Sequence, residues 1–115
     1  MERTIPKPNP SHDLLAIHLR ELGLEFEREV PVCPGRKFRW DFTIPTKRVA
    51  IEIMGSTWTR GRHTRGQGFQ DDCDKANLGA VGGWKVLRFT SQNILSGAAK
   101  EFLKQWIDVR KEPMK

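Results

Sequence analysis

The stretch RWDFTIPTKRVAIEIMG, residues 39–55, contains two runs of bulky residues that favour β-strands, joined by PTKR. Apolar residues alternate with other residues in each run, which is typical of half-buried strands. A connection of the length of residues 45–48 predicts a hairpin. The hairpin sets Ile44 opposite Val49 and Asp41 opposite Glu52. It also gives the strands one shared apolar face, formed by Trp40, Phe42, Ile44, Val49, Ile51 and Ile53.

On the other face, the predicted register brings two carboxylates together, those of Asp41 and Glu52. Directly opposed residues of an antiparallel pair have Cβ atoms about 4.5–5.5 Å apart, and like charges at that separation destabilise a sheet. Mg²⁺ or Mn²⁺ would remove the repulsion, because these ions bind carboxylate oxygens and keep waters and substrate phosphates as further ligands. The alternative is that each acid pairs with a nearby Arg or Lys.

The charge of the chain is concentrated around these acids. The 115-residue chain has a formal net charge of +6. Between residues 36 and 65 there are eight Lys and Arg side chains and only two carboxylates, so this segment accounts for the whole excess. A basic field around a pair of acids indicates a polyanionic substrate.

The length predicts one domain with a single core, residues 11–110, between an extended arm at 1–10 and a tail at 111–115. No stretch approaches the roughly 18 apolar residues of a membrane span, and the first ten residues lack the apolar region of a signal peptide. Cys33 and Cys73 lack CxxC spacing, which favours free thiols in a reducing cytosol, with one disulfide as the alternative. We therefore expect a cytoplasmic protein with no membrane partner.

Periodicity predicts the elements around the hairpin. Helices are expected over about 11–22 and 69–81 and from Thr90 or Ser91 to about 107, and strands over 26–32 and 84–89. The segment 56–68 is expected to be a loop, followed by a helix that buries Phe69, Cys73, Ala76, Asn77 and Ala80. The order α-β-β-β-α-β-α predicts an α/β domain with a mixed four-stranded sheet and helices on both sides.

Four stretches along this order carry a resemblance: RWDF at 39–42, AIEIMG at 50–55, DDCDKAN at 71–77 and GWKVLRFT at 83–90. Together they resemble the PD-(D/E)XK nuclease superfamily, and more closely its small branch of very-short-patch-repair-like and phage or bacterial single-domain endonucleases. The likeness covers roughly residues 11–90. It implies a restriction-endonuclease-like core, hydrolysis of DNA with Mg²⁺ or Mn²⁺, and a metal bound by Asp41, Glu52 and the backbone carbonyl of Ile53.

The sequence departs from the superfamily's motif at two positions. Trp40 replaces a proline that has no chemical part, and Met54 replaces the catalytic lysine. Because that lysine can move to the following helix or a neighbouring strand, two replacements stay open. Lys75 lies in the predicted following helix, and Arg39 falls opposite Met54 in the predicted register. For Lys75, the alternative is a local i,i+4 pair with Asp71.

The segment 56–68 adds candidate DNA contacts. Arg60, Arg62 and Arg65 would hold phosphates, and Trp58 would stack on a base or enter a groove. His63 would assist proton transfer or contact the scissile phosphate. The alternative is a solvated basic loop in which Trp58 only covers the core.

Two other functions are compatible with the sequence. Met54 favours a catalytically silent DNA-binding module of the same fold, and a protein-interaction domain with an incidental basic surface is a third reading. A homodimer also stays open, because cutting both DNA strands would require two sites.

Overall fold

A computed structural model describes residues 10–36, 38–54 and 61–107, with only the backbone described for residues 61–67. One sheet is formed by β1 (Glu27–Pro31), β2 (Arg39–Ile44), β3 (Val49–Met54) and β4 (Lys85–Thr90), in the order β1-β2-β3-β4. The first three strands are antiparallel neighbours, and β4, which follows a helical crossover, is parallel to β3. The predicted α/β domain with a mixed four-stranded sheet is thus confirmed.

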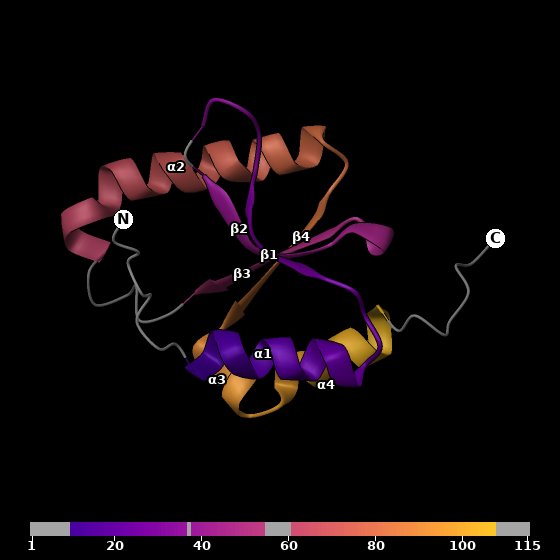
Figure 1. Ribbon diagram of the computed structural model, residues 1–115. Helices are drawn as coiled ribbons and strands as arrows, with labels where there is room; N and C mark the ends of the chain where they lie inside the picture. Colours follow the sequence, from indigo (N-terminus) through magenta and orange to yellow (C-terminus); the bar gives the residue numbers. More distant parts are fainter. Residues whose placement is uncertain (1–9, 37, 55–60, 108–115) are drawn as a thin grey trace, which may run out of the picture.

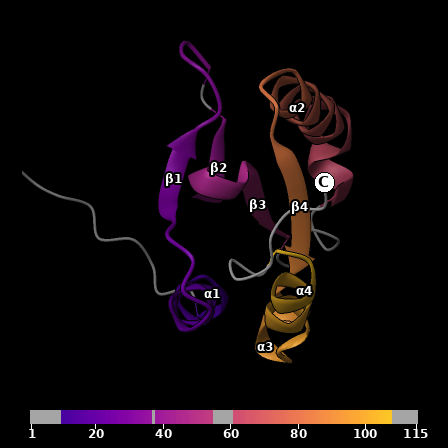
Figure 2. The ribbon, with the colours of Figure 1, turned by 90° about the vertical axis from the view of Figure 1, so that its right-hand side faces the viewer.

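Helices cover both faces of the sheet (Figure 1, Figure 2). One face carries α1 (Pro10–Glu21), α3 (Ser91–Leu95) and α4 (Ala98–Trp106), and the other carries α2 (Gly61–Val81). The single final helix expected from the sequence is divided in two at Gly97, whose φ of 90° lies outside the helical range. Among the described helices, none has the length and apolar composition needed to cross a membrane.

The hairpin has the predicted register over its first three pairs, Ile44–Val49, Thr43–Ala50 and Phe42–Ile51. The connection begins with a 3-10 turn at Pro45–Lys47, after which Arg48 has a left-handed φ of 54°. The Arg48 guanidinium lies 4.3 Å from the centroid of the Trp84 ring and donates to the carbonyl of Gly82. These contacts tie the hairpin to the segment that leads into β4.

The main core lies between the sheet and the layer formed by α1, α3 and α4. Its buried side chains are Leu15, Ala16, Leu19, Leu24, Phe42, Ile44, Val49, Ile51, Phe89, Ile94, Ala99 and Leu103. Trp40 is also buried, but it lies on the opposite face, against Gly79 of α2. The prediction that Trp40 shares a face with Phe42 is therefore wrong. The change of face coincides with a break in the sheet at Asp41, because the pairing of β2 with β3 ends at Phe42 and the pairing of β2 with β1 omits Asp41.

The start and the orientation of α2 also differ from the sequence-based expectation. The helix begins at Gly61, so the loop expected up to residue 68 is wrong. Glycine lowers helix propensity by about 1 kcal/mol per residue, a weak preference that tertiary context overrides. Of the expected inward residues, Phe69, Asn77 and Ala80 are exposed. Gly79 faces the sheet instead, because the missing side chain lets the helix approach Trp40 closely.

Gly79→Ala should lower the free energy of unfolding by about 1–2 kcal/mol, the cost of overpacking less the gain in helix propensity. A Cβ at this position would lie 2.9 Å from Cγ2 of Val86 and 3.1 Å from the Trp40 ring, and neither side chain is flexible. Chemical denaturation of the two proteins measures the change. Asn77→Ala, at an exposed position of the same helix, is the matched control. Unchanged stability of the Gly79 variant would show that α2 does not depend on this close approach.

Candidate functional site

β2 and β3 separate at the level of the two predicted acids. Their pairing ends at Phe42–Ile51 and does not extend to Asp41 and Glu52. On the other side of β2, the pairing with β1 skips Glu29, whose φ of 54° is left-handed. That conformation costs a non-glycine residue about 1–2 kcal/mol, and such strain is concentrated at functional sites in proteins. Within the described strands, Asp41 has no backbone partner on either neighbouring strand, and we call this position, between Asp41 of β2 and Glu52 and Ile53 of β3, the fork.

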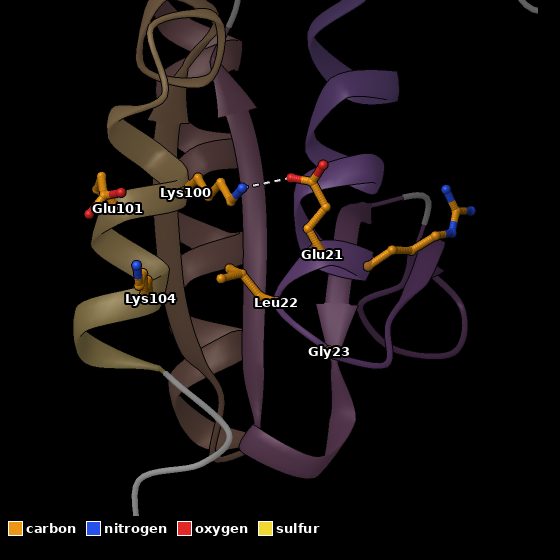
Figure 3. A pocket seen from close by; sticks show the side chains of 7 residues that line it. Glu21, Leu22, Gly23, Lys100, Glu101 and Lys104 are labelled. Carbon is orange, nitrogen blue, oxygen red and sulfur yellow. Dashed lines mark hydrogen bonds and ion pairs between the residues drawn. The ribbon is translucent and has the colours of Figure 1, made fainter.

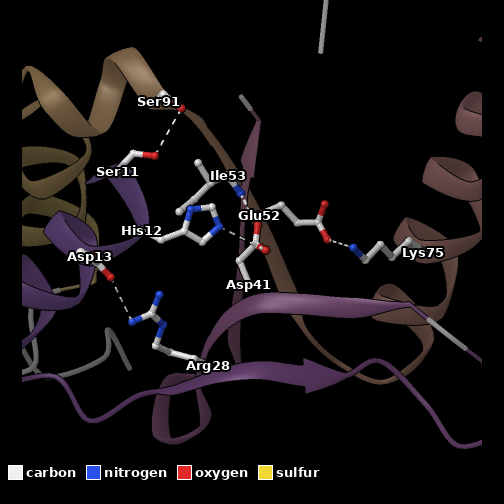
Figure 4. A network of polar contacts seen from close by, with 9 residues as sticks. All are labelled: Ser11, His12, Asp13, Arg28, Asp41, Glu52, Ile53, Lys75 and Ser91. Carbon is white, nitrogen blue, oxygen red and sulfur yellow. Dashed lines mark hydrogen bonds and ion pairs between the residues drawn. The ribbon is translucent and has the colours of Figure 1, made fainter. Parts of the chain in front are cut away.

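Asp41 is contacted by polar groups from two different elements, β3 and α1 (Figure 4). Its Oδ2 accepts a hydrogen bond from the backbone N–H of Ile53, with 2.7 Å between the heavy atoms. Its Oδ1 lies 3.5 Å from Nε2 of His12, in the first turn of α1. Ser11 helps to fix the first turn of α1. It is buried, and its hydroxyl oxygen lies 3.3 Å from that of Ser91. His12 was not among the residues predicted from the sequence, because no local pattern links residue 12 to β2.

Glu52 contacts the opposite layer. Its carboxylate forms an ion pair with Lys75 of α2 (Figure 4), and its side chain is 9% exposed. The Lys75 ammonium also lies 5.4 Å from the centroid of the Trp40 ring. An uncompensated buried carboxylate would cost several kcal/mol, so Lys75 balances the charge that β3 places beneath the helix.

The prediction that Asp41 and Glu52 lie face to face is wrong. Asp41 is directed to α1 and Glu52 to α2, because the hairpin register ends one pair before them. The two residues nevertheless stay adjacent. The Ile53 N–H that donates to Asp41 belongs to the peptide unit that joins Glu52 to Ile53.

The donor atoms at the fork allow a test of the predicted metal. The N–H and the C=O of one strand residue point to the same side, so the carbonyl of Ile53 is directed toward Asp41. A carboxylate and a carbonyl oxygen are hard donors of the kind that Mg²⁺ and Mn²⁺ prefer. Over the described residues, no group of three or more His, Cys, Asp or Glu side chains could hold a metal ion. Asp41 and the Ile53 carbonyl are thus donors of the type that such an ion takes, and Glu52 is the neighbouring acid, which forms an ion pair with Lys75.

Arg39 does not occupy the position expected of it. Met54 pairs with Thr90 of β4, and the Arg39 guanidinium donates to the carbonyl of Glu29, at 3.1 Å. Of the two cations considered as replacements for the missing lysine, Lys75 is the one that contacts an acid of the site.

The remaining candidates lie where side chains are not described. Trp58 and Arg60 lie outside the described residues. Arg62, His63 and Arg65 belong to the first turns of α2, and only their backbone is described. The roles assigned to these five residues stay predictions.

A pocket of about 470 Å³ lies between the C-terminal end of α1 and α4 (Figure 3). Neither Asp41 nor Glu52 lines it. Its lining includes Arg20, Glu21, Lys100 and Lys104. Lys100 donates a hydrogen bond to Glu21, at 2.6 Å, and this bond lowers the pKa of Glu21 below its usual value. None of the predicted site residues whose side chains are described lines this pocket.

Comparison of the chain with protein-family models, with curated proteins and with solved structures finds no match. Its function is therefore inferred from its own residues and their geometry.

Proposed function

We propose that the protein is a metal-dependent endonuclease with a restriction-endonuclease-like core, which hydrolyses phosphodiester bonds of DNA. The observation that carries the proposal is the polar group at the fork, where Asp41 binds the peptide next to Glu52 and Lys75 contacts Glu52. The mixed sheet, in which β4 returns parallel to β3 after α2, supports the resemblance to the PD-(D/E)XK superfamily.

In this proposal, Asp41, Glu52 and the carbonyl of Ile53 hold Mg²⁺ or Mn²⁺, which would polarise the phosphate and supply an activated water. The chain's own residues prepare the site. The Ile53 N–H and His12 orient the Asp41 carboxylate from two sides. Such preorganisation matters because a misplaced ligand loses much of its effect on the reacting group.

Lys75 takes the place of the lysine that Met54 does not supply. It lies at the acid pair, in the helix that follows β3, and its ammonium can offset negative charge that develops on the phosphate. Its ion pair with Glu52 also neutralises the site while no substrate is bound. The pair would then be rearranged when metal and DNA are present.

The direct experiment is incubation of the protein with plasmid, single-stranded and four-way-junction DNA, in Mg²⁺, in Mn²⁺ and in chelator. Cleavage with metal and none with chelator is the expected result, and nicked against linear plasmid tells whether one or both strands are cut. Salt-dependent binding without cleavage in either metal would identify a silent DNA-binding module, which Met54 favours. If the protein neither binds nor cleaves DNA, a protein-interaction domain becomes the favoured function.

Replacing Arg60, Arg62 and Arg65 by Ala should weaken DNA binding and flatten its salt dependence. For each phosphate that is no longer neutralised, the slope of log K against log salt should fall by about 0.9 on duplex DNA. Titration of a labelled duplex over a series of salt concentrations, in chelator, gives the slope. A slope equal to that of the unmodified protein would mean that these arginines form a solvated basic segment that does not touch the phosphates.

A further inference from the structure

Arg88 lies next to Glu52 on the neighbouring strand. In the parallel pairing of β3 and β4, Arg88 is the partner of Glu52. Its neighbours Leu87 and Phe89 face the core formed with α1, α3 and α4. Because side chains alternate along a strand, Arg88 faces the other side of the sheet, where Lys75 contacts Glu52.

Arg88 differs from the other arginines in its contacts. Those whose side chains are described each have a partner: Arg20 with Phe26, Arg28 with Asp13, Arg36 with Asp74, Arg39 with the Glu29 carbonyl and Arg48 with the Gly82 carbonyl. Within residues 10–36, 38–54 and 68–107, Arg88 is the arginine whose guanidinium makes no hydrogen bond, ion pair or ring contact.

Among the residues whose side chains are described, Arg88 has no counter-ion. Glu52 is the acid beside it, but Glu52 is buried and its charge is balanced by Lys75. Arg88 itself is exposed, on a strand at the edge of the sheet. A guanidinium presents five N–H donors in a planar fork that matches the oxygens of a phosphate. An exposed arginine on a strand, with no protein acceptor among the described residues, is suited to an anionic ligand.

We propose that Arg88 binds a backbone phosphate of DNA beside the acid pair and thereby positions the substrate. The identity of this anion rests on the proposed nuclease function. Lys75 and Arg88 then have different tasks. Lys75 balances Glu52 and acts on the reacting group, whereas Arg88 holds the nucleic acid in register with it.

The test compares Arg88→Ala and Arg88→Lys with a control variant, Arg20→Ala. Arg20 is also an exposed arginine, but it lies in the last turn of α1, at the opposite end of that helix from His12. Affinity for a labelled duplex is measured in chelator over a series of salt concentrations. Arg88→Ala should weaken binding about tenfold or more and lower the log–log salt slope by about 0.9. Arg88→Lys should keep the slope, because it keeps the charge, and recover part of the affinity. Arg20→Ala should match the unmodified protein.

Cleavage kinetics separate positioning from chemistry. A contact made equally with bound substrate and transition state sets KM, so Arg88→Ala should raise KM about tenfold and change kcat little. Arg88→Gln, which keeps the carbons from Cβ to Cδ and a polar end but removes the charge, replaces the alanine variant if that variant melts at a lower temperature.

The outcomes distinguish this inference from the nuclease proposal. If Arg88→Ala binds and cleaves DNA as Arg20→Ala does, the inference is overturned and the nuclease proposal stands. If the unmodified protein cleaves no DNA but Arg88→Ala loses affinity and salt slope, the phosphate contact stands and the nuclease proposal is overturned.

Discussion

Glu52→Gln is expected to abolish metal-dependent cleavage, by about a thousandfold or more, while DNA binding is retained. A metal ion supplies several kcal/mol of stabilisation to the reacting phosphate, and the amide removes the charge that helps to hold it. The side chain keeps its shape, so the packing of β3 beneath α2 should persist. Binding should be equal to or slightly stronger than that of the unmodified protein, because Lys75 is released from its ion pair with Glu52.

Single-turnover cleavage and duplex affinity, measured on the same preparations, check this result. Glu101→Gln, at an exposed position of α4, makes the same chemical change away from the site and should cleave normally. Cleavage by the Glu52 variant at the normal rate would show that Glu52 is not a metal ligand. The assignment of the metal to the fork would then fail with it.

The sequence predicted the part of the site that depends on local pattern. Alternation and the length of the connection were enough to fix the register from Phe42–Ile51 to Ile44–Val49. Alternation and loop length did not predict the direction of the Asp41 side chain. That direction depends on where the pairing of β2 with β3 ends and on the left-handed backbone of Glu29 in β1. The contact with His12 depends on the packing of α1, which has no local signal.

For Lys75 and Arg88 too, local sequence pattern predicted part of the position and tertiary packing decided the rest. The sequence left Lys75 between a local partner, Asp71, and a distant acid, and only the rotation of α2 places it at Glu52. That rotation is set by Gly79 against the sheet, not by an apolar stripe along the helix. For Arg88, the alternation in GWKVLRFT already separates it from its apolar neighbours. Its place beside Glu52 required the parallel register of β4, which sequence patterns do not specify.

Lys75→Ala is expected to reduce the single-turnover rate by about two to three orders of magnitude, the effect of losing one preorganised charge-stabilising group. The ion pair adds a second consequence. Loss of Lys75 leaves Glu52 as a buried carboxylate without a counter-ion, which should cost about 3–5 kcal/mol of stability. A slow variant would therefore be ambiguous unless stability and catalysis are separated.

The double variant Glu52→Gln/Lys75→Ala separates the two effects, because it removes both charges at once. Its stability should recover most of what Lys75→Ala loses, since no buried charge is left unpaired. Its activity should stay absent. Recovery of stability in the double variant would show that Lys75→Ala is destabilising because it leaves Glu52 unpaired, so the rate of Lys75→Ala is then measured under conditions in which that variant is folded.

Met54→Lys in the Lys75→Ala background decides whether Lys75 replaces the missing lysine. Met54 follows Glu52 by two positions in β3, so a lysine there lies on the same face as Glu52. If Lys75 supplies the cation of the site, the second substitution should restore part of the cleavage that the first one removes. Arg39→Ala should have little effect, because the Arg39 guanidinium is bound to the carbonyl of Glu29. Cleavage that is absent from the unmodified protein and appears only with Met54→Lys would instead show a binding module whose site lacks its cation. The restored rate in the Lys75→Ala background, measured against the unmodified protein, is therefore the result that assigns Lys75 its role.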